Sequence, residues 1–544
     1  MLTRIAGGRV IDPANGRDGV GDIWISGGRI VEPPQGARAE ATYDAAGKIV
    51  MAGAIDIHSH IAGWNVNTAR LLLPEYHAVA EPRPSVTAAS RIGLNSHATG
   101  CLYAAMGFTT VVEPAMSPHQ ALQTHLELAD IPIIDKGALV ILGNDDYLLG
   151  LLHAKEGEAA VADYVAWNLD ASRSLGIKVV NAGGAAAFKE NVRSFSFDDV
   201  VPSYGLSSRS ILKSLQRAVN GLGVPHPLHV HCNNLGLAGN AETALTTISA
   251  AEGLPLHLAH LQFYGYGKEG ERGFSSAAAP VAEAVNATPS VTIDVGQVMF
   301  GQTVTISSDV LRQFNARNQA RPRKWVIFDG DSNGAGIVPY DYRRNDFYNA
   351  VQWAVGLELF LLISDPWRVF LTTDHPNGAH FATYPEIFAL LMSRDLRAQW
   401  LAELPPAAVA VTTLPSIARE YSLVEIATMT RAAPAKLLGL ADRGHLGAGA
   451  VGDVAVYEND PDRAKMFRAA ALVFKDGELV VRDGEVVSYR WGRALTVRPD
   501  RDCAIDRRMR AYYEDRYGLS DELFRVPEHA LSRPEPFELV PCAR

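Results

Sequence analysis

Eight short apolar runs, each ending in polar residues, recur along the middle of this chain with helix-like stretches between them. The runs span residues 54–60, 108–113, 138–144, 177–181, 228–233, 256–262, 291–297 and 369–374. A strand and a helix that alternate eight times predict an α/β fold of the (β/α)8 TIM type, in which parallel strands close into a barrel. Active sites of such barrels lie at the carboxyl ends of the strands, so the polar residues that end these runs are the candidate site.

The two ends of the chain follow a different pattern. Short β-rich runs near the amino end are separated by Gly, Asn and Pro, and two Asp-Gly turns lie between apolar runs near the carboxyl end. Both patterns are typical of antiparallel hairpins. We therefore expect residues 1–50 and 436–500 to form a small β-sandwich domain together, residues 51–435 to form the barrel, and residues 501–544 to form an extension that wraps the barrel or a neighbouring chain.

Composition excludes several classes of protein. The chain has 544 residues, of which 47% are apolar and 20% are charged, as expected for a soluble protein with a large core. Its net charge of −10 argues against a general nucleic-acid binder. The four cysteines form no CxxC pair, so neither a disulfide framework nor an iron–sulfur cluster is indicated. The amino end lacks the apolar segment of a signal peptide and no run is long enough to cross a bilayer, which predicts a cytoplasmic protein without membrane contact.

The first run ends in two histidines, His58 and His60. Because side chains alternate along a strand, both rings are expected to point to the same side at the mouth of the barrel. A His-x-His pair in that position is an arrangement typical of metal ligands. Taken alone, the pair could also be two loop histidines that are satisfied by hydrogen bonds.

Histidines also end the fifth and sixth runs. His231 and His260 lie nearest the carboxyl ends of these runs, which makes them the favoured metal ligands. His257 and His260 have opposite parity, so one of the two is expected to face the surrounding helices. His229 could line a lower layer of the barrel, support a ligand from behind, or contact the substrate.

A carboxylate and a lysine complete the candidate set. Asp374 ends the eighth run, where it could bind a metal and accept a proton from water; a helix cap or turn is the alternative. Lys178 lies inside the apolar fourth run, and burial disfavours its ammonium form. A neutral amine can react with carbon dioxide to give a carbamate able to bridge two cations. The alternative is an ion pair with Asp374 or Glu113.

Together these positions resemble the metal-dependent amidohydrolase superfamily, which carries His-x-His on strand one, Lys on strand four, His on strands five and six, and Asp on strand eight. Longer strings are similar to those of one family within it, formed by the A-subunits of formylmethanofuran dehydrogenase and of the related bacterial formyltransferase/hydrolase complex. These strings are DIHSHIAGWNVN, GIKVVNAGG, LHVHCNNLG, HLAHLQFYGYG and TTDHPNG. The resemblance extends over residues 1–500.

The resemblance implies a centre of two zinc ions. The His-x-His pair and Asp374 would hold one ion, His231 and His260 would hold the other, and an N6-carboxylysine at Lys178 would bridge them. It also implies a function in one-carbon metabolism and formaldehyde oxidation, namely hydrolysis of the N-formyl amide of formylmethanofuran or formylmethylofuran to formate and the free furan amine. Asp374 would be the catalytic proton acceptor, and the other subunits of such a complex would be partners.

Further residues are candidates for substrate binding. The residues beside the expected ligands are Asn181, His229, Asn233, Asn234 and His375. Turn formation by the asparagines and a solvent-facing loop position for His375 are the alternatives. A basic segment at residues 311–344 contains Arg312, Arg317, Arg321, Arg323, Lys324, Arg343 and Arg344. It could bind the acidic tail of the furan carrier or a partner subunit, or it could be a solvated insertion paired with its own carboxylates.

Two other functions fit the same residues. The chain could be an amidohydrolase that cleaves a cyclic amide or an N-acyl amino acid, because one metal cage serves many substrates. It could also be a catalytically idle scaffold protein within a complex. Formate release from a formylated furan amine tests the first alternative, and metal content tests the second.

Overall fold

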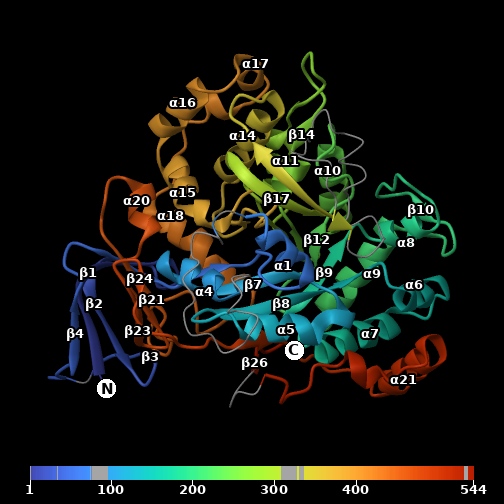
Figure 1. The fold of residues 1–544 in the computed structure, drawn as a ribbon, viewed down its shortest axis with the longest axis horizontal. Coiled ribbons are helices and arrows are strands. Elements are labelled where there is room, and N and C mark those ends of the chain that lie inside the picture. The colour runs from blue at the N-terminus through green and yellow to red at the C-terminus, as the bar shows by residue number, and fades with distance from the viewer. Residues whose placement is uncertain are drawn as a thin grey trace.

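The computed structural model describes residues 2–33, 35–73, 75, 96–307, 328–329, 336–531 and 537–543. Its centre is a sheet surrounded by helices (Figure 1), in which eight of the ten parallel strands form the barrel. In the order in which they pair, the strands are β6 (Ala54–Asp56), β7 (Phe108–Met116), β8 (Asp135–Leu142), β9 (Gly176–Val180), β12 (His229–His231), β13 (Leu256–Leu258), β16 (Val291–Asp294) and β20 (Val369–Phe370). The predicted set of eight parallel strands is confirmed.

The last strand returns beside the first. A parallel bridge joins Ser59 to His375, and the backbone N–H of His60 donates to the carbonyl of His375 at 2.9 Å. The sheet therefore curls round in the manner of a TIM-type barrel. Most strands end two to four residues before the predicted runs do, so most of the polar residues of interest lie in the first turns beyond the carboxyl ends of the strands.

Helices cover the outside of this sheet. The main ones are α4 (Ser96–Ala105), α5 (Ala121–Ala129), α7 (Glu158–Ala171), α9 (Ser208–Gly221), α10 (Ala241–Ala250), α11 (Ala278–Ala287) and α14 (Phe347–Leu362). Side-chain caps fix where several of them begin. The Ser207 side chain accepts from the backbone of Ser210 in a capping box at α9, and the Asp346 side chain accepts from the first turn of α14.

Shorter helices complete the outer layer, and an antiparallel sheet lies in the long interval before α14. These helices are α1 (Trp64–Arg70), α6 (Asp146–His153), α8 (Gly184–Lys189), α15 (Tyr384–Met392), α16 (Arg394–Ala402), α17 (Pro406–Val409), α18 (Leu423–Ala427), α19 (Ala433–Leu437) and α20 (Arg463–Arg468). The added sheet contains β17 (Gly301–Ser307), β18 (Phe328–Asp329) and β19 (Gly336–Tyr342).

Strands from both ends of the chain form a second sheet. They are β1 (Leu2–Asp12), β2 (Arg17–Ser26), β3 (Arg29–Ile30), β4 (Ala41–Asp44), β5 (Ile49–Ala52), β21 (Val454–Tyr457), β22 (Leu472–Lys475), β23 (Glu478–Arg482) and β24 (Glu485–Val486). Antiparallel pairing of β21 with β5 joins the two halves, which lie side by side in Figure 1. The hydrogen bonds connect all nine strands into one sheet, while the sandwich packing and the domain boundaries stay predictions.

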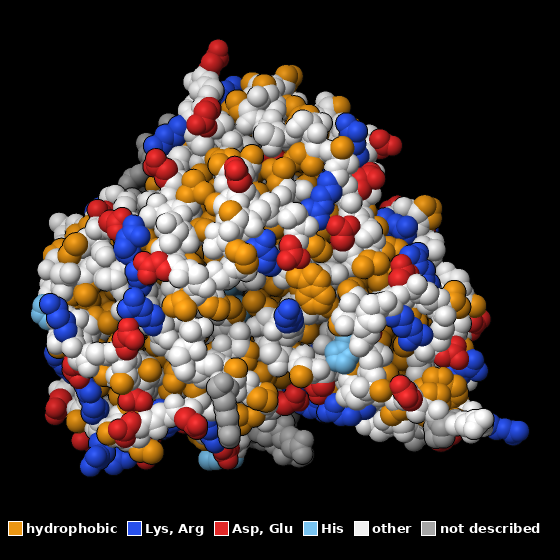
Figure 2. Space-filling view, turned by 180° about the vertical axis from the view of Figure 1, so that it is seen from behind, with side chains coloured by type: hydrophobic (Ala, Val, Ile, Leu, Met, Phe, Trp, Pro, Cys, Tyr) orange, Lys and Arg blue, Asp and Glu red, His pale blue; other side chains and the backbone are white. Residues whose placement is uncertain are grey.

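The carboxyl-terminal extension lies on the barrel. Helix α21 (Ala504–Tyr517) contacts α7, where the rings of Tyr513 and Trp167 are 6.2 Å apart. Strand β26 (Phe537–Leu539) pairs with β25 (Ala494–Thr496), which in turn pairs with the start of β8. No helix in the described part of the chain is long and apolar enough to cross a membrane. Lys and Arg side chains are interspersed with Asp and Glu over the face seen in Figure 2.

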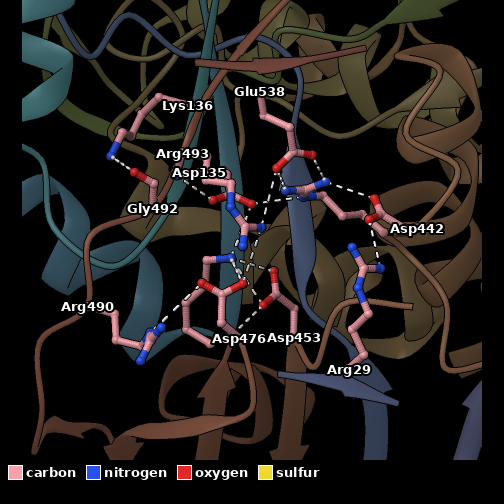
Figure 3. Close-up of polar contacts among 12 residues, drawn as sticks. Arg29, Asp135, Lys136, Asp442, Asp453, Asp476, Arg490, Gly492, Arg493 and Glu538 are labelled. Atoms are coloured by element: carbon pink, nitrogen blue, oxygen red, sulfur yellow. Dashed lines mark hydrogen bonds and ion pairs between the residues drawn. The ribbon is translucent and has the colours of Figure 1, made fainter. Parts of the chain in front are cut away.

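A buried network of charges connects the terminal sheet to the barrel (Figure 3). Lys475 on β22 is fully buried, and its Nζ lies 2.9 Å from Asp453 and 3.1 Å from Asp135 at the start of β8. Arg443 donates to Asp135 at 2.8 Å and to Glu538 at 2.7 Å. Burial alone would raise the pKa of Asp135, but the positive charges of Lys475 and Arg443 hold it below its usual range. Charges from the sheet, the barrel and the extension thus neutralise one another.

Replacing the buried amine in this network should destabilise the chain. Lys475→Ala leaves Asp453 buried without its main counter-charge, and we expect it to lower the free energy of unfolding by about 3–5 kcal/mol. Denaturant titration measures the change. The control is Lys465→Ala, which removes a lysine whose ion pair with Asp460 lies at the surface, and should leave the midpoint almost unchanged. Equal midpoints for the two variants would contradict the assignment.

Candidate metal centre

Three predicted ligands meet at the mouth of the barrel. His58 and His60 follow β6, and Asp374 follows β20. Oδ1 of Asp374 lies 2.9 Å from Nε2 of His58 and 3.3 Å from Nε2 of His60, and all three side chains are almost completely buried. Their ligand atoms are close enough together to hold one metal ion. The two rings lie on the same side, as predicted, although both residues follow the end of β6.

Lys178 lies next to this group. Its Nζ is 3.2 Å from Nε2 of His58, and its side chain projects from β9 into the buried interior. Burial lowers the pKa of Lys178, although the negative charges of Asp374 and Asp294 oppose the shift. The lowered pKa favours the neutral amine, which is the form that can react with carbon dioxide.

A second pair of histidines lies beside the first group. Nδ1 of His231 and Nε2 of His260 are 3.0 Å apart, and burial holds the pKa of His260 well below its ordinary value. Two nitrogen ligands of a tetrahedral zinc ion lie roughly 3.3 Å apart, so this spacing suits a shared cation. Imidazoles and a carboxylate are ligands that zinc accepts, so the group of His58, His60 and Asp374 fits a metal ion, while a second ion at His231 and His260 stays a prediction.

Buried carboxylates contact the His58 and His60 rings at Nδ1, the nitrogen that faces away from Asp374. Nδ1 of His58 lies 3.0 Å from Oδ2 of Asp294, and Nδ1 of His60 lies 3.0 Å from Oε1 of Glu113. The other oxygen of Glu113 accepts the backbone N–H groups of Ile61 and Ala62. Such contacts fix the tautomer and orientation of a metal-binding histidine. Sequence reasoning considered Glu113 only as an ion-pair partner and missed Asp294, whose signal is a carboxylate inside the seventh run, at the point where β16 ends.

His60 is the ring whose charge these carboxylates affect most. Burial alone would lower the pKa of His60, but the nearby charges of Glu113 and Asp374 raise it to about 9. Burial alone would raise the pKa of Asp374, but its electrostatic interactions with the His260 and His58 rings and its hydrogen bonds with His58 and His60 hold that pKa well below its usual range. The first group therefore carries an ionised carboxylate at neutral pH.

The expectation that His257 or His260 faces the surrounding helices is wrong. Nε2 of His257 lies 3.0 Å from Asp294, and the His260 ring reaches His231, so both histidines belong to the interior cluster. Strand β13 ends at Leu258, and His260 adopts a left-handed backbone with φ of 34°. Strand parity no longer applies two residues beyond the end of the strand.

His229 lies behind the ligands. Its Nε2 is 3.0 Å from Nδ1 of His58, its Nδ1 is 3.0 Å from Nε2 of His226, and its side chain is fully buried. Burial together with the neighbouring charge of His257 holds its pKa well below the ordinary value. Of the roles that the sequence left open for His229, this position matches support of the predicted ligand His58 from behind. A direct contact with substrate is therefore not favoured.

The predicted substrate-binding asparagines bond to one another and to the loops. The amide of Asn233 donates to the side chain of Asn181 at 2.5 Å and to Ser208 at 3.0 Å, and Asn234 donates to Thr243 at 3.2 Å. Asn181 and Asn234 both have positive φ, as expected for turn asparagines. Their contact with substrate stays a prediction.

His375 is buried, which excludes the solvent-facing alternative. Its ring centre lies 4.6 Å from that of His380, and its backbone carbonyl accepts from His60. Among the basic residues, Arg343 donates to Asp341 and Arg344 pairs with Glu403. Arg312, Arg317, Arg321, Arg323 and Lys324 lie outside the described residues.

Comparison with known proteins identifies the family. Residues 41–488 match the model described as the amidohydrolase family. The chain belongs to that family. It is 52% identical to the A-subunit of the formyltransferase/hydrolase complex Fhc of Methylorubrum extorquens over 100% of both chains, and 38% identical to protein FwdA of Methanocaldococcus jannaschii over 91% of this chain and 90% of that one. The resemblance inferred from the local strings is confirmed.

Solved structures of amidohydrolases share the fold. The crystal structure of the FhcABCD complex from Methylorubrum extorquens with methylofuran contains a chain that superposes with a TM-score of 0.93, at 52% identity over all of both chains. N-acyl-D-glutamate deacylase from Bordetella bronchiseptica superposes with a TM-score of 0.51 at 18% identity, over 90% of this chain and 98% of that one. The second likeness shows the fold alone.

The contact between Glu113 and His60 predicts a pH dependence of the metal-free protein. The raised pKa of His60 means that its protonation stabilises the fold fully below pH 6.5, and that this stability is lost as the pH rises through about 9. Glu113→Gln should lower the pKa of His60 and flatten this part of the stability profile. NMR titration and denaturation in chelator measure both effects. Glu358→Gln is the control, because Glu358 is equally buried but bonds to Ser276, Thr413 and Leu414. An unchanged His60 titration in Glu113→Gln would contradict the prediction.

Proposed function

We propose that this chain hydrolyses the N-formyl amide of a formylated furan amine, formylmethanofuran or formylmethylofuran, to formate and the free amine. The observation that supports this proposal is the convergence of His58, His60, Lys178, His231, His260 and Asp374 at one end of the sheet. Full-length similarity to a component of a formyltransferase/hydrolase complex supports the choice of a formyl amide over other amides.

Two zinc ions would occupy the site. His58, His60 and Asp374 would hold one, His231 and His260 the other, with Lys178 between them. The neutral amine of Lys178 would attack the carbon of carbon dioxide, form an N–C bond and lose a proton, which leaves an anionic carbamate (N6-carboxylysine) to bridge the ions. The low pKa of Lys178 and its burial beside His58 favour this modification.

When bound, the zinc ions would lower the pKa of a water molecule toward about 7 and polarise the formyl oxygen. Asp374 would accept the proton of that water and then donate it to the leaving nitrogen, as a general base followed by a general acid. Its carboxylate is ionised at neutral pH and lies at the mouth of the barrel, where both proton transfers take place.

The Fhc complex of Methylorubrum extorquens also suggests the partners and the carrier of this chain. The crystal structure of its complex contains methylofuran and three further kinds of subunit, so we infer that this chain also works beside formyltransferase subunits. An acidic tail on the carrier would suit the basic residues of the 311–344 segment.

Removing the proton acceptor tests the reaction. Asp374→Asn should lower formate release by about 10²–10⁴-fold, because general acid–base catalysis contributes about that factor. Zinc content is measured on the same samples, so that loss of metal is separated from loss of proton transfer. Asp341→Asn, a surface change of the same kind, should keep full activity. Full activity of Asp374→Asn would exclude hydrolysis at this site, and faster turnover of an N-acetyl or cyclic amide would favour a different amidohydrolase.

The basic segment gives a second test of substrate class. Replacing Arg312, Arg317, Arg321 and Arg323 by Gln should raise KM for a carrier with an acidic tail and leave KM for a tail-less formyl amine unchanged. Steady-state kinetics on both substrates measures the difference. Equal effects on the two substrates would rule out recognition of the tail.

A further inference from the structure

One buried carboxylate contacts ligands of both predicted zinc ions. Asp294 is the last residue of β16, and its side chain is completely buried. It faces Nδ1 of His58, while Asp374 faces Nε2 of the same ring. Neither the family pattern nor the residues proposed as ligands include it.

The Oδ2 atom of Asp294 holds the first ligand group. It lies 3.0 Å from Nδ1 of His58 and 3.0 Å from Nε2 of His257. An ionised carboxylate only accepts hydrogen bonds, so a hydrogen bond from His58 to Asp294 places the proton of His58 on Nδ1, the atom that Nε2 of His229 also approaches at 3.0 Å. The Nε2 lone pair is then free to face Asp374 and Lys178, which is the orientation that a metal ligand needs.

The Oδ1 atom of Asp294 holds the second group through the backbone. It accepts the N–H of His260 at 2.6 Å. His260 adopts a left-handed backbone with φ of 34°, which a side-chain-bearing residue keeps only where its surroundings hold it in place. Gly296 provides the space, since a Cβ at that position would lie 2.5 Å from the Cβ of His260. This backbone directs the His260 ring toward His231.

We propose that Asp294 is a positioning residue shared by both metal sites: it fixes the tautomer of His58 and the backbone of His260 without binding either ion. Glu113 differs because it contacts the ring of His60 and the backbone beside it, and so serves one site. The inference rests on the proposed two-metal function. It adds to that function a single carboxylate, Asp294, that holds a ligand of each ion in place.

Zinc titrations with a competing chelator test the proposal. Metal-free wild type, Asp294→Asn, Glu113→Gln and Glu358→Gln are compared, each at one pH and carbon dioxide concentration. Asp294→Asn should weaken both zinc-binding steps by about 10–100-fold, the usual effect of losing such a contact. Glu113→Gln should weaken one step, and Glu358→Gln neither. Weakening of only one step in Asp294→Asn, or of none, would overturn the inference.

A measurement on the wild-type protein tests the inference even if Asp294→Asn does not fold. ¹⁵N NMR of the metal-free wild type should show His58 protonated on Nδ1, and protonation of His58 on Nε2 alone would also overturn the inference. Both readouts are independent of catalysis. A wild type that binds two zinc ions but releases no formate would defeat the proposed function and still leave the role of Asp294 measurable.

Discussion

Hydrogen bonds between buried imidazoles and buried carboxylates organise the interior of this barrel. His58 is bonded to Asp294 and His60 to Glu113 on the sides that face away from Asp374. Unpaired, these groups would be costly to bury, because neither a carboxylate nor an imidazolium is stable away from water. Paired, they fix the orientation of both rings. The site can therefore keep its shape before any cation arrives.

The sequence was sufficient to predict the strands and most of the cluster. Eight apolar runs ending in polar residues placed the strands, and the prediction that His58 and His60 point to one side is met although both follow the end of β6. Strand parity failed at His257 and His260, because β13 ends early and a left-handed residue redirects the chain. Asp294 was missed because a lone carboxylate within an apolar run looks the same in sequence whether it caps a turn or contacts three histidines. Contacts between strands far apart in sequence decide that difference.

Two buried polar clusters of opposite character lie in the same molecule. Around the candidate metal centre, burial lowers the pKa of several histidines, and neutral rings with ionised carboxylates leave the site attractive to cations. In the network of Lys475, Asp135 and Arg443, each charge already meets an opposite one. The first arrangement suits binding, while the second suits permanent attachment of the terminal sheet to the barrel.

The sheet that joins both ends of the chain has a consequence for biosynthesis. Strand β5 leads directly into the first barrel strand, yet its antiparallel neighbour β21 begins only at Val454. During translation the edge of β5 that pairs with β21 therefore stays unpaired until more than four fifths of the polypeptide has been synthesised. Such an edge invites pairing with the wrong strand. The terminal sheet of this chain can therefore be completed only after the carboxyl-terminal strands have been synthesised.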